Sequence, residues 1–174
     1  MRFAGKPIGV LFLTILGIGC TPKSLPKTRT EKPSPAAKVV EVARSYIGVP
    51  YKLGGMDRKG IDCSGLVCRV YQEAVNLPLP RTADAQAQQG QPIKGKLQPG
   101  DLVFFQEPKA KKITHVGIVS HTAGEEVYFI HASTSKGVRE DLLSDPHWKK
   151  RYVGARRLLR PDAKAALHTG QQGK

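Results

Sequence analysis

The sequence is short of aromatic and acidic residues, and both shortages narrow the class of protein. Phe, Trp and Tyr make up 6% of the 174 residues, which disfavours a protein that binds nucleic acid by stacking bases on aromatic rings. Asp and Glu number 14 against 28 Lys and Arg, so the net charge is +14. This charge favours anionic partners such as phospholipid or wall polymers. Nucleic acid fits the charge equally well, so the cellular compartment has to decide between them.

Long hydrophobic runs are scarce as well. The apolar stretch at residues 8–16 is too short for an ordinary membrane-spanning helix, and it follows a positively charged start. Small residues then precede Cys20, a layout typical of a secretory signal peptide. The junction resembles a bacterial lipobox, which implies cleavage before Cys20 and attachment of lipid to it. We expect a signal peptide at residues 1–19 and lipidation of Cys20, with plain secretion or an uncleaved anchor as the alternatives to lipidation. Because the protein is then exported, no nucleic-acid partner is expected.

Cysteine is scarce too, with three residues in the whole chain. Lipid would occupy Cys20, which leaves Cys63 and Cys68. On one helix, residues five apart have Cα atoms roughly 8–9 Å from each other, which is beyond the reach of a disulfide. Cys63 is therefore expected to be a free thiol, for which catalysis is one explanation. Cys68 lacks a comparable setting and is expected to be structural.

The remaining sequence predicts one folded domain at residues 37–160. Residues 20–36 comprise Cys20 and a stretch rich in Pro, Lys, Thr and Ser that is typical of a flexible tether. Residues 161–174 lack core material and are expected to be a disordered tail. Hydrophobic periodicity predicts helices at 37–47, from 63 onward and at 81–86, followed by strands at 101–105, 115–120, 127–132 and 152–159. Helices first and an antiparallel sheet afterwards indicate an α+β fold.

The most informative motif is Asp62-Cys63-Ser64-Gly65, at the start of the second predicted helix. Asp62 is a suitable N-cap. A thiol at a helix N-terminus lies where backbone N–H groups and the helix dipole favour negative charge, so the motif predicts a stabilised thiolate at Cys63. Cys63 shares a helical stripe with the apolar residues that follow it, which predicts a side chain directed toward the sheet.

Two histidines on predicted strands complete a candidate catalytic set. If the hairpin between the strands centres near residue 123, His115 and His131 lie directly opposite each other, with Cβ atoms ~4.5–5.5 Å apart. A different loop length would turn one histidine to the other face of the sheet. In the predicted chemistry Cys63 attacks a carbonyl carbon, His115 takes and returns the proton, and His131 orients His115. The backbone N–H of Cys63 is suited to stabilise the oxyanion.

Zinc is the other chemistry that cysteine and histidine side chains support. Cys63 and Cys68 point in divergent directions on one helix, and His115 and His131 lack the close spacing of zinc motifs. The sequence therefore predicts no metal and no cofactor.

Several stretches, taken together and in this order, resemble the NlpC/P60 family of papain-like cysteine peptidases. The matching stretches are Pro50–Gly55, Gly60–Val67, Arg81–Thr82 with Gln86, Leu97–Phe105, His115–Val119 and Ile130–Ala132. The resemblance implies a papain-like fold with the nucleophile helix packed on a central antiparallel sheet. It also assigns Cys63 as nucleophile, His115 as base and His131 as the orienting residue.

The resemblance further implies roles near the substrate for four residues. Tyr51 would place its hydroxyl near the oxyanion or the substrate, and a packed loop aromatic is the alternative. Asp62, Ser64 and Arg81 would contact the substrate. A helix cap or a structural hydrogen bond is the alternative for Asp62 and Arg81.

The function that follows is hydrolysis of peptidoglycan stem peptides, usually between D-γ-glutamyl and a diamino acid. We expect a monomeric enzyme of the bacterial cell envelope, anchored to a membrane by lipid on Cys20 and located in the periplasm, at the outer membrane if the cell is Gram-negative. One alternative is a non-catalytic module that binds or scaffolds the wall. Another is a papain-like thiol amidase or acyltransferase that acts on a different substrate.

Overall fold

The computed structural model describes Met1 and residues 32–159. The predicted signal peptide, Cys20, residues 20–31 of the predicted tether and the predicted tail lie outside the described residues. No helix within the described part of the chain is both long enough and apolar enough to cross a membrane.

The first two predicted helices precede the sheet, and each begins at a side-chain cap. Helix α1 (Pro35–Arg44) starts where the Ser34 hydroxyl accepts a hydrogen bond from the Ala37 N–H at 3.2 Å. Helix α2 (Cys63–Val75) starts where Asp62 Oδ1 accepts a hydrogen bond from the Gly65 N–H at 2.7 Å. Both caps satisfy N–H groups that have no partner inside the helix. The prediction that Asp62 is the N-cap of α2 is confirmed.

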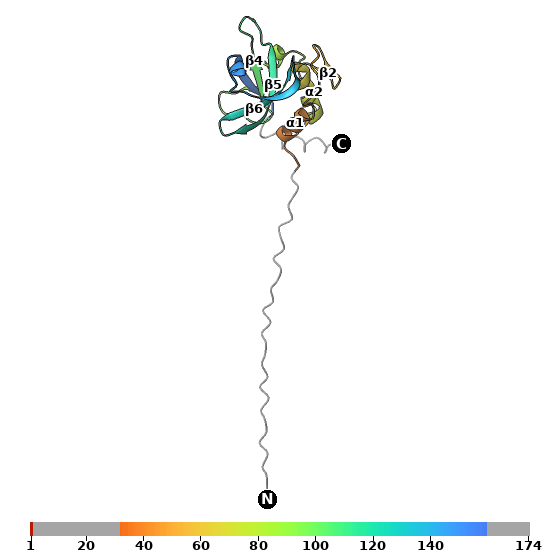
Figure 1. Cartoon of the computed structure of the whole chain (residues 1–174), viewed down its shortest axis with the longest axis vertical. Coiled ribbons are helices and arrows are strands. Elements are labelled where there is room, and N and C mark those ends of the chain that lie inside the picture. The colour runs from red at the N-terminus through yellow and green to blue at the C-terminus, as the bar shows by residue number, and fades with distance from the viewer. Residues whose placement is uncertain (2–31, 160–174) are drawn as a thin grey trace, which may run out of the picture. The chain divides into compact units, whose positions relative to one another are not determined.

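A six-stranded sheet with antiparallel neighbours forms the centre of the fold (Figure 1). Its order is β3-β8-β4-β5-β6-β7. The strands are β3 (Gln91–Pro92), β4 (Leu102–Phe105), β5 (His115–Ala123), β6 (Glu126–Ser133), β7 (Gly137–Leu142) and β8 (Tyr152–Arg157). Figure 1 shows α1 and α2 together at one side of this sheet. The predicted α+β fold, with the helix that carries Cys63 packed on an antiparallel sheet, is confirmed.

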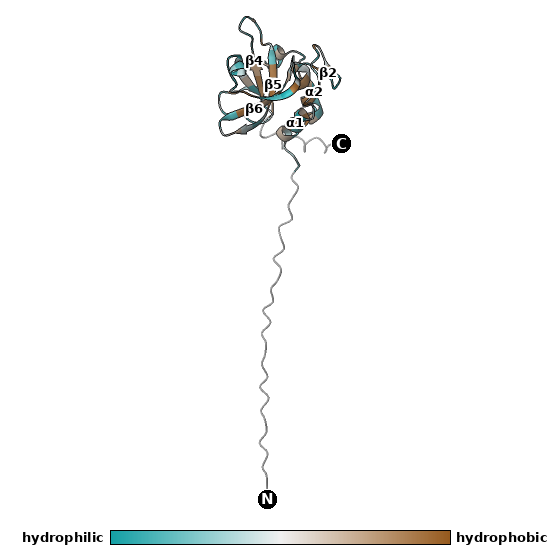
Figure 2. Cartoon of the chain, viewed as in Figure 1, coloured by the Kyte–Doolittle hydropathy of each residue, from teal (hydrophilic) through white to brown (hydrophobic). Residues whose placement is uncertain are grey.

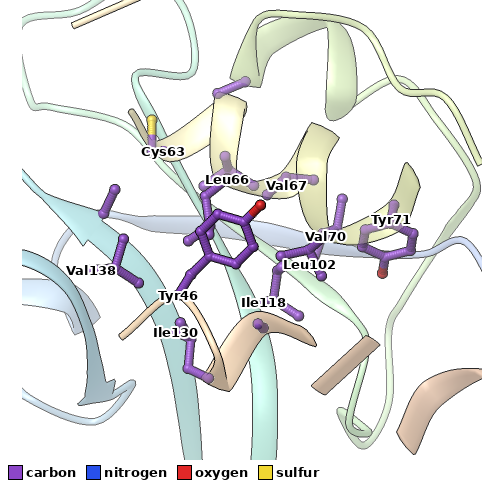
Figure 3. Close-up of a cluster of buried hydrophobic side chains, with 14 of the residues drawn as sticks. Tyr46, Cys63, Leu66, Val67, Val70, Tyr71, Leu102, Ile118, Ile130 and Val138 are labelled. Atoms are coloured by element: carbon purple, nitrogen blue, oxygen red, sulfur yellow. The ribbon is translucent and has the colours of Figure 1, made fainter. Parts of the chain in front are cut away.

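The sheet has a hydrophobic layer on each face. The first layer packs α1 and α2 against alternate residues of the central strands, among them Leu102, Ile118 and Ile130 (Figures 2 and 3). The second layer uses the intervening residues and is closed by Trp148. Its buried members are Val103, Phe105, Val119, Phe129 and Ala155. Side chains of neighbouring strand residues therefore serve different layers.

Several short elements are absent from the sequence-based prediction. The predicted loop at residues 51–61 contains β1 (Met56–Asp57) paired with β2 (Gly60–Ile61). The predicted helix at 81–86 is confined to α3 (Ala83–Gln86), which is capped by Thr82. Strand β7 and helix α4 (Pro146–Lys149) are also new. Both lie beside the two histidines described below.

Candidate active site

Cys63 is the first residue of α2 and is buried, with its sulfur at the end of the first hydrophobic layer (Figure 3). Gly65 allows a loop to approach this helix start closely. A Cβ atom at Gly65 would lie 2.3 Å from the Gly55 carbonyl oxygen, so a side chain there would push the loop away. The predicted orientation of Cys63 toward the sheet is confirmed by its place in the core.

The pKa of the Cys63 thiol differs from the prediction made from the motif. Burial raises this pKa, and the negative charge of Asp62 raises it further. The backbone N–H groups of Val116, Ser64 and Cys63 act in the opposite direction, as expected at a helix N-terminus. Burial outweighs them, so the prediction of a stabilised thiolate is wrong for the free protein, which holds a thiol.

Asp62, Ser64 and Arg81 form one hydrogen-bonded cluster beside Cys63. The Arg81 guanidinium donates two parallel hydrogen bonds of 2.8 and 2.7 Å to the Asp62 carboxylate. It also donates to the Ser64 hydroxyl at 2.8 Å. Asp62 also accepts from the Gly54 N–H at 2.8 Å. Burial raises the pKa of Asp62, but the hydrogen bonds and charge of Arg81 and the backbone N–H groups outweigh it, so the pKa is lowered.

A cavity of about 470 Å³ opens at Cys63. Its lining includes Tyr51, Leu53, Arg81 and Thr114, so it extends from the loop before α2 to the residue next to His115. Burial raises the pKa of Tyr51, and the nearby charges of Cys63 and Asp62 raise it further, which keeps the hydroxyl protonated. The structure thus brings all four predicted substrate-site residues to one cavity wall, because Asp62 and Ser64 line it too.

His115 and His131 are hydrogen-bonded to each other, with His115 Nε2 2.9 Å from His131 Nδ1. The prediction that they lie directly opposite each other is wrong. The register pairs Ile118 with Ile130, and its continuation places His131 across from Gly117. The two histidines are therefore diagonal neighbours on one face of the sheet, close enough for imidazole rings to meet.

A β-bulge accounts for this arrangement. Next to the turn that joins β5 and β6, His121 pairs with Tyr128. Farther from the turn Val119 pairs with Phe129, so Ser120 is an extra residue on β5. Without this extra residue the pairing next to the turn would continue along both strands, and one histidine would face the other side of the sheet. The bulge thus directs both side chains to the second face, a common use of bulges next to active sites.

Asp141 on β7 extends the chain of polar contacts, and the sequence analysis missed it. Its Oδ2 lies 3.0 Å from His131 Nε2 and accepts a hydrogen bond from Trp148 Nε1 at 3.1 Å. The Trp148 ring, on α4, stacks on His115 with centroids 5.3 Å apart. Predicting β7 as a strand would have placed Asp141 beside His131, but the charged residues at 139–141 obscure the pattern of a strand.

Both histidines are held as neutral imidazoles. Burial, together with the smaller effect of positive charge on His131 and His147, lowers the pKa of His115 to about 3. Burial also lowers the pKa of His131, although the hydrogen bond and charge of Asp141 oppose this. The uncharged form of each ring can donate from one nitrogen and accept at the other.

Cys63 and His115 lie on different faces of the sheet. Cys63 belongs to the first layer, whereas His115 lies on the second face near Phe105 and Trp148. The two residues are linked through the backbone at the start of β5, because the N–H of Val116, the residue after His115, interacts with the Cys63 sulfur. This geometry combines a thiol, a neutral imidazole and an open cavity, which is the equipment of a thiol-dependent acyl-transfer enzyme.

The model of the NlpC/P60 family matches residues 48–157, which contain this cavity and the histidine pair. The chain belongs to the NlpC/P60 family. Its predicted membership and fold are therefore confirmed.

Three relatives of this NlpC/P60 chain illustrate the match. It is 37% identical to the probable endopeptidase NlpC of Escherichia coli K12, over 86% of this chain and 97% of that protein. It is 40% identical to the murein DD-endopeptidase/murein LD-carboxypeptidase MepS of the same strain, over 71% of this chain and 63% of that protein. It is 42% identical to the gamma-DL-glutamyl hydrolase of Bacillus subtilis 168, over 69% of this chain and 29% of that protein. The prediction that the chain is an endopeptidase is confirmed at this level.

A solved structure supports the same conclusion for the fold. The NlpC/P60 family protein from Bacillus cereus ATCC 10987 superposes with a TM-score of 0.66 at 30% sequence identity. The match covers 74% of this chain and 41% of that one, so the common part is the domain described above.

Two further predictions concern side chains of this NlpC/P60 domain. Cys68 is buried and free, with its sulfur 3.3 Å from the Pro80 carbonyl and within reach of the Gln86 amide at 3.4 Å. It does not line the cavity at Cys63, which agrees with a structural role. Within residues 32–159, no three His, Cys, Asp or Glu side chains are grouped to hold a metal ion. The predicted independence from metals and cofactors stays a prediction.

Proposed function

We propose that this NlpC/P60 protein hydrolyses peptide bonds in peptidoglycan, with Cys63 as the nucleophile. The observation that carries the proposal is that Cys63 lines an open cavity that reaches Thr114, the neighbour of His115, while His115 is hydrogen-bonded to His131. The names of the relatives support the substrate, because one is a murein endopeptidase and another a gamma-DL-glutamyl hydrolase.

The reaction begins with proton transfer from the Cys63 thiol to the free nitrogen of His115. The sulfur attacks the carbonyl carbon of the peptide bond and forms a tetrahedral intermediate. The protonated His115 then gives the proton to the leaving amine, and a thioester remains on Cys63. Water, deprotonated by His115, attacks the thioester and regenerates the thiol. Catalytic hydrogen bonds often tighten only when substrate binds, so a loose contact between thiol and imidazole in the free protein is compatible with this role.

Two donors are available for the oxyanion of the intermediate. The backbone N–H of Cys63 lies at the helix start, where it has no partner within the helix. The Tyr51 hydroxyl lines the same cavity and stays protonated because its pKa is raised. Both groups can donate hydrogen bonds to the developing negative charge.

The substrate bond we propose joins a D-γ-glutamyl residue to a diamino acid. A γ-linked glutamyl residue keeps a free α-carboxylate, and Arg81 lines the cavity with 38% of its side chain exposed. Arg81 is thus placed to contact that carboxylate. Asp62 and Ser64 already make hydrogen bonds within their own cluster, so their principal role here is to hold Arg81 and the helix start, with Ser64 also lining the cavity.

We further propose that the protein is a lipoprotein of the cell envelope, anchored through Cys20 and monomeric. The support is the N-terminal sequence alone, together with the net charge of +14, which favours anionic surfaces. Growth with labelled palmitate tests the anchor. The protein should take up the label, and Cys20→Ala should abolish it. Size-exclusion chromatography coupled to light scattering should give the mass of one chain.

A digest of purified muropeptides tests the enzymatic proposal. Products are read by mass spectrometry for the unaltered protein, for Cys63→Ala and for Cys68→Ser as the matched thiol control. Fragments ending in D-γ-glutamate, made by the unaltered protein and Cys68→Ser but not by Cys63→Ala, establish both the bond and the nucleophile.

Other outcomes of the digest assign the alternatives. Separation of crosslinked dimers into monomers would contradict the proposed bond and indicate a DD-endopeptidase. Binding to sacculi without any product would favour the non-catalytic wall-binding module. Neither binding nor cleavage by a folded protein with a reactive Cys63 would favour an amidase or acyltransferase for a different substrate.

A further inference from the structure

We propose that Asp141 is a positioning residue that fixes which nitrogens of His131 and His115 carry protons, and so leaves a free nitrogen on His115 for the Cys63 thiol. The proton arrangement itself does not depend on the proposed function; only its role in activating Cys63 rests on that function. Asp141 touches neither the cavity nor Cys63. It acts through His131.

The contacts form one continuous chain. Asp141 Oδ2 lies 3.0 Å from His131 Nε2, and His131 Nδ1 lies 2.9 Å from His115 Nε2. His131 is fully buried, so water does not compete for its nitrogens. Both ring nitrogens of His131 are thus engaged by defined partners.

The protonation states follow from the carboxylate. An ionised carboxylate only accepts hydrogen bonds, so the proton between Asp141 and His131 lies on His131 Nε2. The neutral His131 ring then has an unprotonated Nδ1, which accepts the proton of His115 Nε2. The neutral His115 ring has its unprotonated nitrogen at Nδ1. That atom is the one left to accept the thiol proton.

The surroundings of Asp141 keep it ionised and in place. Burial raises its pKa, but the hydrogen bonds and charge of its partners outweigh this and lower it. The partners are His131 and Trp148 at Oδ2, together with the Arg139 guanidinium at Oδ1. Without Asp141, His131 has no acceptor fixed at Nε2 and can reverse its proton, which would place a proton on His115 Nδ1 and block the base.

The contacts also predict how two substitutions differ. In Asp141→Asn the amide oxygen can replace Oδ2 and accept from both His131 and Trp148, since an amide nitrogen there would meet two donors. The proton arrangement is then kept, but the amide nitrogen replaces Oδ1 and faces the Arg139 guanidinium, so both the charge and the contact with Arg139 are lost. In Asp141→Leu the acceptor itself is lost. The matched control is Glu140→Gln, because Glu140 is the preceding residue of β7 and pairs with Arg44 on the other face.

Nitrogen-15 NMR of the imidazole side chains tests the inference directly, with no substrate present. We expect both His115 and His131 of the unaltered protein to carry their proton on Nε2. Asp141→Asn and Glu140→Gln should keep this pattern, and Asp141→Leu should lose it at His131. A proton on His131 Nδ1 in the unaltered protein would overturn the inference, as would an unchanged pattern in folded Asp141→Leu.

Kinetics on muropeptides provide a second readout. We expect Asp141→Leu to lower kcat at least about tenfold with KM unchanged, since proton transfer is affected and substrate binding is not. Asp141→Asn should recover part of this loss, and Glu140→Gln should behave like the unaltered protein. Equal losses in Asp141→Asn and Asp141→Leu would contradict the role of the acceptor. An unaltered protein that cleaves nothing would count against the proposed function, while the NMR result would still decide the role of Asp141.

Discussion

The ring of Phe129 occupies the space in which a side chain at Gly117 would lie. A Cβ atom at Gly117 would be 2.5 Å from Phe129 Cδ2, much closer than atoms can approach. Phe129 in turn packs against His131, with ring centroids 5.0 Å apart and planes inclined by 29°. The missing side chain of one residue therefore lets the other support the histidine pair from below.

Gly117→Ala should destabilise the protein and weaken its activity. The added methyl group must displace a buried ring, and overpacking of this kind costs about 1–3 kcal/mol. Gly95→Ala is the matched control, because nothing lies within 4 Å of its added methyl group. Urea unfolding of the two variants measures the difference. Equal stability of both would show that Phe129 yields without cost.

Arg81→Gln should destabilise the helix start and impair hydrolysis together. It removes both hydrogen bonds from a carboxylate that is 9% exposed. Solvent around the exposed part of Arg81 screens the ion pair. We therefore expect the free energy of unfolding to fall by about 1–2 kcal/mol, less than for a fully buried pair. Arg69→Gln breaks the exposed pair with Glu73 and should cost about 0.3–0.5 kcal/mol. Similar losses for both in thermal unfolding would contradict the structural weight given to Arg81.

The stability of the fold should fall as the pH is lowered from 7 to 4.5. In the unfolded chain His115 binds a proton below its ordinary pKa of 6.5, whereas in the fold its pKa is lowered to about 3 by burial. The unfolded state thus gains protons first, so stability is complete above pH 6.5 and declines below it. His131, with a lowered pKa, contributes in the same direction.

Urea midpoints measured across this range for the protein and for His115→Gln check the pH prediction. The variant should lose less stability on acidification, because the residue that titrates is gone. Asp62 and Asp141 contribute little in this range, since the unfolded chain protonates them mainly near and below their ordinary pKa of 3.8 and the fold lowers that pKa. A variant with the same pH dependence as the unaltered protein would show that His115 is not held neutral.

Cys68→Ser should keep hydrolytic activity and lose little stability. A serine hydroxyl can make the same contacts with the Pro80 carbonyl and the Gln86 amide that the thiol makes. The side chain is buried, so the shorter hydroxyl leaves a small packing defect. Activity and thermal unfolding measured side by side test this. An inactive but folded variant would mean that Cys68 has a role beyond packing.

The helix start around Cys63 was predictable because its signals are local. Asp62 as a cap and the apolar stripe of α2 depend on residues a few positions apart, and both are confirmed. The thiol pKa was not predictable in the same way. It depends on how deeply the fold buries Cys63, which the motif does not encode.

The histidine pair shows where local reasoning ends. Its two members were identified from their strands, but their register depends on the bulge at Ser120, for which the sequence carries no clear signal. Asp141 was missed because it lies on an edge strand rich in charge, between Arg139 and the turn that precedes α4. Contacts with β6 and with the short helix α4 place it, and neither contact follows from residue spacing.

The division of the site between two hydrophobic layers gives the protein a property that neither layer has alone. The thiol is positioned by packing on the helical side of the sheet, and its base by packing on the side closed by Trp148. A chain in which only one side has formed holds a nucleophile without a base, or a base without a nucleophile. The proposed cleavage therefore requires both layers to be packed at the same time, and loss of packing on either face of the sheet would abolish it.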